Sequence, residues 1–231
     1  MALDHRQSLI FDADDTLWEN NIYFEDAFER FCSYLSHSSM SPQQIRDVLD
    51  EIELANIKIH GYGSVNFARN LSECYRRLAE RHISEQDLEA VKEYAYDILK
   101  RPIELLPGVV ETLDQLAPRH DLTLFTKGDP EEQRLKLDRS GLRDHFHHVA
   151  IVKEKNVTAY QLLALERSSH PDRTWMIGNS PKSDINPALA AGLRAVFVPH
   201  PRTWSLEHED VPEEHPRLLR VSSIVELTNY F

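Results

Sequence analysis

Three carboxylates stand within four positions directly after a short apolar run, in Asp12-Ala13-Asp14-Asp15. Like charges this close repel one another, and a bound divalent cation would offset that repulsion. Asp12 and Asp14 are two positions apart, so in extended backbone their side chains point to the same side. One can then act as a nucleophile and the other as an acid and base. An acidic turn that caps the next helix explains the spacing equally well, so the spacing alone leaves both interpretations open.

A hydroxyl group and several lysines follow two further apolar runs. Thr126 ends one run and precedes Lys127 and a glycine, so its hydroxyl and the nearby backbone N–H groups can bind an oxyanion. Lys153 and Lys155 follow the next run, and a lysine at that place can neutralise phosphate charge. Taken singly, a simple turn and two surface lysines account for these residues.

A third polar loop opens after the apolar residues Trp175–Ile177. It begins with Gly178 and Asn179 and contains Asp184, just before an alanine-rich helical stretch. Asp184 is either the N-cap of that helix or a ligand of a metal ion.

These polar segments share one position, the carboxyl end of a predicted strand. Helical periodicity fills the gaps between the later strands, as in Pro130–Ser140 and Thr158–Arg167. Strands alternating with helices predict an α/β fold with a Rossmann-like, doubly wound parallel sheet, in which ligands bind at the carboxyl edge. The predicted strands are Ser8–Phe11, Leu122–Phe125, Val149–Val152, Trp175–Ile177 and Ala195–Val198.

The interval between the first two strands has no strand pattern. Apolar residues there recur at helical spacing, and Ser41-Pro42 and Ser84-x-x-Asp87 are typical helix starts. We therefore expect a catalytic core formed by residues 1–18 and 103–231, with an α-helical domain over residues 19–102 inserted after the first strand. We expect this insertion to lie over the ligand edge of the sheet.

The order of the polar segments resembles the motifs of the haloacid dehalogenase-like superfamily of hydrolases. Asp12-x-Asp14-x-Thr16 is similar to the first motif, Thr126 to the second, Lys155 to the third and Gly178-Asn179-x-x-x-x-Asp184 to the fourth. The four segments occur in the family's order and together span nearly the whole chain. Only the first is specific by itself, so the joint occurrence carries the resemblance.

The resemblance implies a role for each matching residue. Asp12 would attack phosphorus and form an aspartyl-phosphate, and Asp14 would protonate the leaving oxygen and then activate water. Thr126 and Lys155 would hold the phosphoryl oxygens, with Lys127 as a further phosphate contact. Lys155 is preferred to Lys153 because the residues after it resemble the family pattern, although Lys153 stays an alternative.

The resemblance also implies Mg²⁺ as cofactor. The Asp12 carboxylate, the Asp14 backbone carbonyl and Asp184 would bind the ion. Asn179 stands where many relatives have aspartate. An amide adds no charge, so Asn179 would orient Asp184 or a water molecule on the metal.

Substrate choice is expected from two places. Family members that cleave carbon–halogen bonds lack an acid at the place of Asp14, so Asp14 favours a phosphate ester. The helical insertion matches the position of the family's first type of cap, which usually selects the leaving group. Within it, Gly61-Tyr62-Gly63 is the candidate hinge or specificity loop, with Tyr62, Asn66 and Arg69 as candidate contacts; an ordinary interhelical turn explains this segment as well.

Composition excludes several other classes of protein. Among 231 residues, 38 acidic against 26 basic side chains give a formal charge of −12, so we expect no nucleic-acid polymer as partner. No apolar run is long enough for a membrane span, and residues 1–6 lead into no signal-peptide pattern. Cys32 and Cys74 are expected to be unreactive thiols. These features predict a cytoplasmic protein, monomeric or homodimeric.

The combined hypothesis is a Mg²⁺-dependent phosphatase that hydrolyses a small phosphate monoester. A sugar phosphate, a phosphoglycolate-like acid and a nucleotide all fit this description. One alternative is a phosphomutase acting on a sugar phosphate, which would share the Asp12 and Asp14 pair. The other is a catalytically weak protein that binds a phosphate ligand, for which the neutral Asn179 leaves room.

Overall fold

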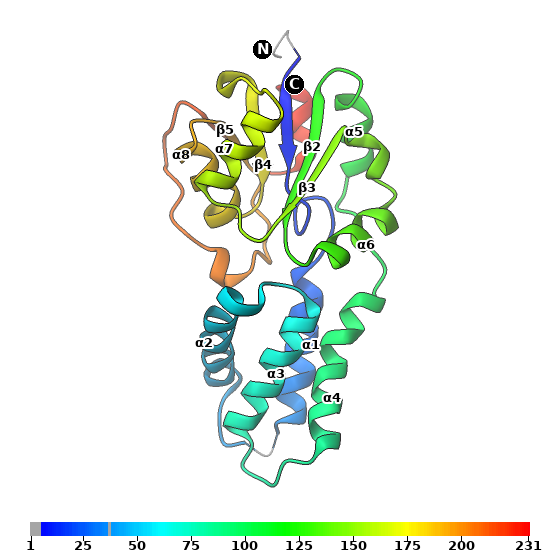
Figure 1. Cartoon of the computed structure of the whole chain (residues 1–231), viewed down its shortest axis with the longest axis vertical. Coiled ribbons are helices and arrows are strands. Elements are labelled where there is room, and N and C mark those ends of the chain that lie inside the picture. Colours follow the sequence, from blue (N-terminus) through cyan, green and yellow to red (C-terminus); the bar gives the residue numbers. More distant parts are fainter. Residues whose placement is uncertain (1–5, 37) are drawn as a thin grey trace. The chain divides into compact units, whose positions relative to one another are not determined.

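The chain forms two compact units, each with its own core. The computed structural model describes residues 6–36 and 38–231; the sequence features expected at residues 1–5 therefore lie outside the described residues. One unit combines Met1–Asn21 with Ile103–Phe231, and the other comprises Ile22–Pro102 (Figure 1). The long insertion follows the first strand along the chain.

The larger unit is built on a six-stranded sheet with all neighbouring strands parallel. Its order is β3-β2-β1-β4-β5-β6, which confirms the predicted doubly wound, Rossmann-like α/β fold. The strands are β1 (Ser8–Phe11), β2 (Asp121–Lys127), β3 (His148–Val152), β4 (Thr174–Gly178), β5 (Arg194–Phe197) and β6 (Leu218–Arg220). The sequence pattern missed β6, because a three-residue strand at the sheet edge shows neither alternation nor a long apolar run.

Alternating side chains of β1 are buried against helices on both faces of the sheet. Leu9 and Phe11 belong to one apolar cluster, and Ile10 belongs to another. The first cluster includes residues of α5 (Val109–Leu116), α6 (Pro130–Ser140) and the final 3₁₀ helix (Ile224–Asn229). The second includes residues of α7 (Val157–Glu166) and α8 (Asn186–Ala190). Burial on both faces explains why the central strands are continuous apolar runs in the sequence.

The strand order reverses beside β1. The chain adds β2 and β3 on one side of β1 and then crosses to place β4 on the other side. In open parallel sheets a ligand crevice forms at such a switch point, outside the carboxyl ends of the strands. The residues directly after β1, beginning with Asp12, lie at this place.

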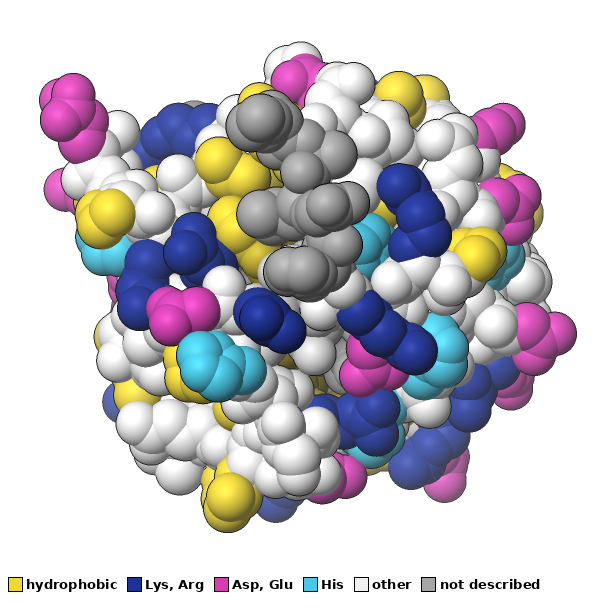
Figure 2. Space-filling view, turned by 90° about the horizontal axis from the view of Figure 1, so that it is seen from above, with side chains coloured by type: hydrophobic (Ala, Val, Ile, Leu, Met, Phe, Trp, Pro, Cys, Tyr) yellow, Lys and Arg dark blue, Asp and Glu magenta, His cyan; other side chains and the backbone are white. Residues whose placement is uncertain are grey.

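The amino ends of the strands, opposite the carboxyl ends that carry the site residues, are rich in arginine. Each strand has an arginine at its start or a few residues before it: Arg6, Arg119, Arg143, Arg173, Arg194 and Arg217. Figure 2 views this end and shows Lys, Arg and His side chains gathered on it. Since the whole chain carries a formal charge of −12, the basic residues of this edge are matched by an acidic surplus elsewhere.

The smaller unit is a bundle of helices. Its helices are α1 (Asn21–Tyr34), α2 (Pro42–His60), α3 (Ser64–Leu78) and α4 (Glu85–Tyr96), followed by a 3₁₀ turn (Asp97–Lys100). The predicted helix starts are confirmed, since Ser41 and Ser84 each form a capping box with the residue three positions later. Within the part of the chain that is described, no helix is both long and apolar enough to cross a membrane.

The two cysteines lie in the core of the helical unit. Cys74 is fully buried and Cys32 partly buried, and both are free thiols. Burial raises the pKa of Cys74 to about 12 and also raises the pKa of Cys32. Both groups therefore stay protonated near neutral pH, as expected for unreactive thiols.

A buried carboxyl group makes the stability of the helical unit dependent on pH. Burial raises the pKa of Glu53 from 4.5 to about 8; Arg46 opposes this shift, and Asp50 and Glu25 add to it. As pH rises from about 4.5 to about 8, the unfolded chain ionises first, so folding loses up to about 1.4 kcal/mol per pKa unit. We expect the melting temperature of Glu53→Gln to decrease less between acid and alkaline pH than that of the unaltered protein.

Thermal unfolding at about pH 5 and pH 9 measures this effect. Glu51→Gln is the matched control, because Glu51 lies on the same helix with its side chain exposed. An equal pH dependence in both variants would show that Glu53 does not control the stability of this unit.

Candidate active site

Four neighbouring strands bring the predicted site residues to one edge of the sheet. Asp12 directly follows β1, Thr126 lies near the end of β2, Lys155 follows β3 and Asn179 follows β4. Because β3, β2, β1 and β4 are adjacent and parallel, their carboxyl ends share this edge. All four residues are buried, so the site is a feature of the core and not of a mobile surface loop.

The ammonium group of Lys155 links two of the predicted carboxylates. Lys155 donates hydrogen bonds to Asp12 Oδ1 and, at 2.7 Å, to Asp184 Oδ1, with only 1% of its side chain exposed. Burial alone would lower the pKa of Lys155, but the two carboxylates outweigh burial and raise it. The amine is therefore a permanent positive charge. Lys153, the alternative left open by the sequence, is exposed.

Asp184 is held by a tight polar turn after β4. It belongs to a π-helical turn over Pro181–Ile185, and its Oδ2 accepts the backbone N–H of Ser180 at 3.0 Å. Burial and the nearby Asp12 raise the pKa of Asp184 to about 7, although Lys155 opposes this shift. A β-carbon on Gly178 would lie 2.2 Å from Asp184 Oδ2, so only glycine lets the carboxylate fold back over the strand end.

Thr16 joins the first and fourth motifs. Its hydroxyl oxygen lies 3.1 Å from Asp12 Oδ2 and 3.2 Å from Asn179 Oδ1. Asn179 in turn donates its amide to the hydroxyl of Thr203 at 2.9 Å. The amide oxygen of Asn179 therefore faces the same cluster as the carboxylate of Asp12.

The side chain of Asp14 is bound by residues that the sequence analysis did not identify. Lys136 and Gln133 of α6 and the indole N–H of Trp18 all donate to it. Trp18 is fully buried in the core, as a packing residue should be, but its indole N–H also orients Asp14. Lys136 and Gln133 are three positions apart and so share one face of α6.

Lys127 forms an ion pair with Glu207, a residue that the sequence did not point to. Its ammonium donates to Glu207 Oε1 at 2.6 Å and to the Ser183 hydroxyl at 2.8 Å. Glu207 Oε2 also accepts from the hydroxyls of Ser180 and Ser183. These contacts tie the end of β2 to the turn that carries Asp184, so in the structure the Lys127 amine stabilises that turn.

The predicted contacts from the helical unit lie around the turn between α2 and α3. Asn66 donates its amide to the carbonyl oxygens of His60 and, at 3.1 Å, of Tyr62. Arg69 Nη1 lies 3.1 Å from His60 Nδ1. Asn66 and Arg69 thus stabilise this turn, and the role of Tyr62 at the substrate stays a prediction.

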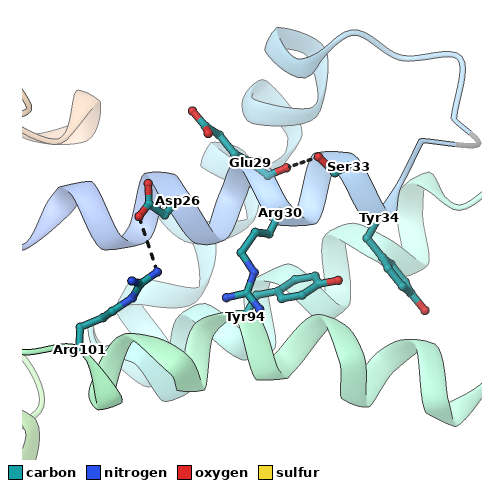
Figure 3. A pocket seen from close by; sticks show the side chains of 7 residues that line it. All are labelled: Asp26, Glu29, Arg30, Ser33, Tyr34, Tyr94 and Arg101. Carbon is teal, nitrogen blue, oxygen red and sulfur yellow. Dashed lines mark hydrogen bonds and ion pairs between the residues drawn. The ribbon is translucent and has the colours of Figure 1, made fainter.

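A pocket of about 590 Å³ lies within the helical unit and holds none of the predicted site residues. Arg30 stacks 4.5 Å from the centre of the Tyr94 ring and pairs with Asp97 at 3.0 Å. Arg101 pairs with Asp26 at 3.7 Å (Figure 3). Both arginines of this pocket are thus paired with carboxylates.

A second cluster of polar groups joins the loop after β1 to the segment after β5. Ligand atoms of Asp15, Glu19 and His200 lie within 4.8 Å of one another. Asp15 also accepts the backbone N–H groups of Asn20 and Asn21 at 2.9 and 3.0 Å, so it caps the entry to α1. These contacts give Asp15 a structural role in this loop, apart from the cluster around Asp12.

The charges of the site favour a divalent cation. Three lysines are paired with four carboxylates: Lys127, Lys136 and Lys155 with Asp12, Asp14, Asp184 and Glu207. A phosphate ester would add further negative charge, which these lysines cannot balance. Asp12, Asp184 and Asn179 offer carboxylate and amide oxygens, the ligands that Mg²⁺ prefers. The residues present therefore fit a magnesium ion.

The chain is similar to several known hydrolases. A profile of haloacid dehalogenase-like hydrolases matches residues 7–192. The pyrimidine 5′-nucleotidase YjjG of Escherichia coli is 31% identical over 128 residues, covering 53% of this chain and 54% of that protein. A phosphoserine phosphatase of Thermus thermophilus is 34% identical over 111 residues, covering 46% of this chain and 42% of that protein. The match thus spans about half the length of these relatives.

A solved structure is similar over almost the full length of the chain. It is that of a haloacid dehalogenase-like family hydrolase from Xanthomonas campestris, with a TM-score of 0.82 and 29% identity. The similarity covers 96% of this chain and 92% of that one, so both units have counterparts there.

Proposed function

Because this chain belongs to the haloacid dehalogenase-like hydrolase family, we propose that it hydrolyses a small phosphate monoester through an aspartyl-phosphate on Asp12. The observation that carries this proposal is the contact of Lys155 with both Asp12 and Asp184. A carboxylate can approach an anionic phosphate only where cations offset the repulsion, and phosphoryl transfer depends mainly on positioning and charge stabilisation. The Lys155 contact supplies the first such cation beside the nucleophile.

The reaction consists of two balanced steps. In the first, a carboxylate oxygen of Asp12 bonds to phosphorus, the bond to the leaving oxygen breaks, and Asp14 gives that oxygen a proton. In the second, Asp14 takes a proton from water, the water oxygen attacks phosphorus, and the bond to Asp12 breaks. Inorganic phosphate leaves, and both carboxyl groups return to their starting state. Thr126 and Lys155 hold the phosphoryl oxygens during both steps.

Magnesium completes the proposal. The Asp12 carboxylate, the Asp14 backbone carbonyl and Asp184 would hold the ion, with Asn179 beside them. When bound, it neutralises phosphate charge that the lysines leave unbalanced. Gly178 supports the assignment, because its missing side chain leaves the space that Asp184 needs.

The relatives narrow the substrate class. By their names, one acts on pyrimidine 5′-nucleotides and the other on phosphoserine, which are both small phosphate monoesters. We propose the same class here, with residues 19–102 as the cap and Tyr62 as a contact to the leaving group. Asp14 separates this activity from carbon–halogen cleavage, which needs no acid for the departing halide.

Phosphate release from a panel of esters tests the proposal. The panel contains p-nitrophenyl phosphate, sugar phosphates, phosphoglycolate, pyrimidine 5′-nucleotides and phosphoserine, each assayed with Mg²⁺ and with EDTA. We expect Mg²⁺-dependent release from several of them and its loss with EDTA. Chloride release from 2-chloropropionate without phosphate release would show a dehalogenase instead, and isomerised sugar phosphate without phosphate release would show a mutase.

A further inference from the structure

The side-chain amide of Asn179 lies between two hydroxyl groups. On one side, its Oδ1 is 3.2 Å from the hydroxyl oxygen of Thr16, which also lies 3.1 Å from Asp12 Oδ2. On the other side, its Nδ2 donates to the hydroxyl oxygen of Thr203 at 2.9 Å. An amide has an accepting end and a donating end, so its direction decides whether an oxygen or an N–H group faces the carboxylate of Asp12.

The hydroxyl of Thr203 sets this direction. It donates its one proton to the carbonyl oxygen of His200 at 3.0 Å, and a carbonyl oxygen can only accept. Toward Asn179 the same hydroxyl can then only accept, and the NH₂ group is the part of an amide that donates. The NH₂ group therefore lies at Thr203, and the amide oxygen faces Thr16 and Asp12.

This direction leaves more acceptors than protons around Thr16. Its hydroxyl carries one proton, whereas Asp12 Oδ2 and Asn179 Oδ1 are both acceptors. Thr16 and Asn179 are buried, so an acceptor that the proton does not reach has little access to solvent. A cation beside these oxygens would satisfy it, and oxygen ligands of this kind suit Mg²⁺.

The threonine that accepts the amide belongs to a segment after β5, residues 200–207, which is attached to the core on both sides of it. Before it, the carbonyl oxygen of Arg202 accepts the side-chain amide of Asn21 at 2.9 Å. After it, Glu207 is buried and accepts the hydroxyl of Ser180 at 2.6 Å. These contacts hold the threonine hydroxyl in place beside the amide.

We propose that Thr203 is a positioning residue of the metal site, which holds the Asn179 amide with its oxygen toward the cation. This inference rests on the magnesium ion of the proposed function. Thr203 acts through Asn179, whose NH₂ group it binds. An amide without this partner can turn its NH₂ group toward the ion, and a cation repels that group. Residues that orient a metal ligand typically contribute about 10- to 100-fold in metal affinity.

Mn²⁺ binding in the absence of substrate measures this role. Mn²⁺ takes the same oxygen ligands as Mg²⁺, its EPR spectrum reports the free ion, and competition by Mg²⁺ identifies the shared site. We expect Thr203→Val, which removes the hydroxyl at nearly constant size, to raise the Kd about 10-fold, and Thr203→Ser to keep it nearly unchanged. Thr228→Val is the control, because Thr228 also donates to the carbonyl oxygen three positions earlier, that of Val225.

A second background separates orientation from packing. In Asn179→Asp the side chain ends in two oxygens and has no N–H group, so an oxygen faces the cation in either direction. Thr203→Val should therefore raise the Kd of the unaltered protein but change that of Asn179→Asp little, which makes the two substitutions non-additive. An equal increase in both backgrounds, or no increase in the unaltered background, would overturn the inference. If Thr203→Val does not fold, Thr203→Ala takes its place in both backgrounds.

The same titration distinguishes this inference from the proposed function. If the unaltered protein binds no Mn²⁺ that Mg²⁺ displaces, the magnesium site of the proposed function has failed, and the role of Thr203 fails with it. That result is seen before any variant is compared. If the unaltered protein binds the ion and the variants contradict the expected pattern, the inference about Thr203 fails alone.

Discussion

Replacing Asp12 with asparagine is expected to lower kcat/KM for phosphate release by at least about 10⁴-fold. The amide is isosteric with the carboxylate, and its oxygen can still accept the Thr16 hydroxyl hydrogen bond. Lys155 keeps its contact with Asp184, so the fold should persist. What disappears is the anionic oxygen that attacks phosphorus. Phosphate release and intact-protein mass spectrometry after a rapid quench measure turnover and the covalent intermediate.

Asp15→Asn provides a matched control for this substitution. It also removes a carboxylate from the loop after β1, and its amide oxygen can still accept the N–H groups of Asn20 and Asn21. We expect this control to keep most of the activity and to form the phosphorylated protein. Substantial metal-dependent turnover by Asp12→Asn, with a phosphorylated intermediate, would mean that another residue is the nucleophile.

The sheet could be predicted from the sequence because its central strands are buried on both faces. Continuous apolar runs such as Trp175–Ile177 identify central strands, and helical periodicity between them requires parallel connections. Once the strands are parallel, polar residues directly after them must share one edge. This is why Asp12, Lys155 and Asp184, which are far apart in the sequence, could be expected in one cluster. The structure brings their side chains into contact.

The residues that support this cluster could not be read in the same way. Lys136 and Gln133 stand among the charged residues of α6, and any of these would be equally plausible without knowing the rotation of the helix. Glu207 lies at the end of a three-residue 3₁₀ turn in an otherwise irregular segment, which has no periodicity to place it. The large apolar ring of Trp18 favours packing, but the direction of its indole N–H depends on the loop conformation.

These supporting residues share one physical task, which is to hold like charges close together. Glu207 accepts hydrogen bonds from Ser180 and Ser183 and so holds the turn that carries Asp184. Lys136 of α6 holds Asp14. Sequence motifs identify the reactive groups, because these groups directly follow strands and the strand ends determine where they lie. The charges that make such a cluster stable come from wherever the fold brings a lysine or a hydroxyl group, and this information is absent from local sequence.

Replacing Lys155 with methionine should destabilise the protein and abolish phosphate release. Removing one partner of a buried ion pair costs about 3–5 kcal/mol, because the remaining charges are left buried and unpaired. Burial and Asp12 already raise the pKa of Asp184 to about 7, and without Lys155 it should rise further. The destabilisation should therefore be smaller at about pH 5 than at about pH 8, because Asp184 then keeps its proton more readily. Urea unfolding at both pH values measures this difference.

A second substitution distinguishes charge from packing in this variant. Asp184→Asn in the Lys155→Met background removes one of the two unpaired carboxylates, so part of the lost stability should return while phosphate release stays absent. Lys153→Met is the control, because that exposed side chain should be replaceable with little change in stability or activity. If both lysine substitutions had the same effect, or if Asp184→Asn destabilised Lys155→Met further, the ammonium of Lys155 would not be what holds Asp12 and Asp184 together.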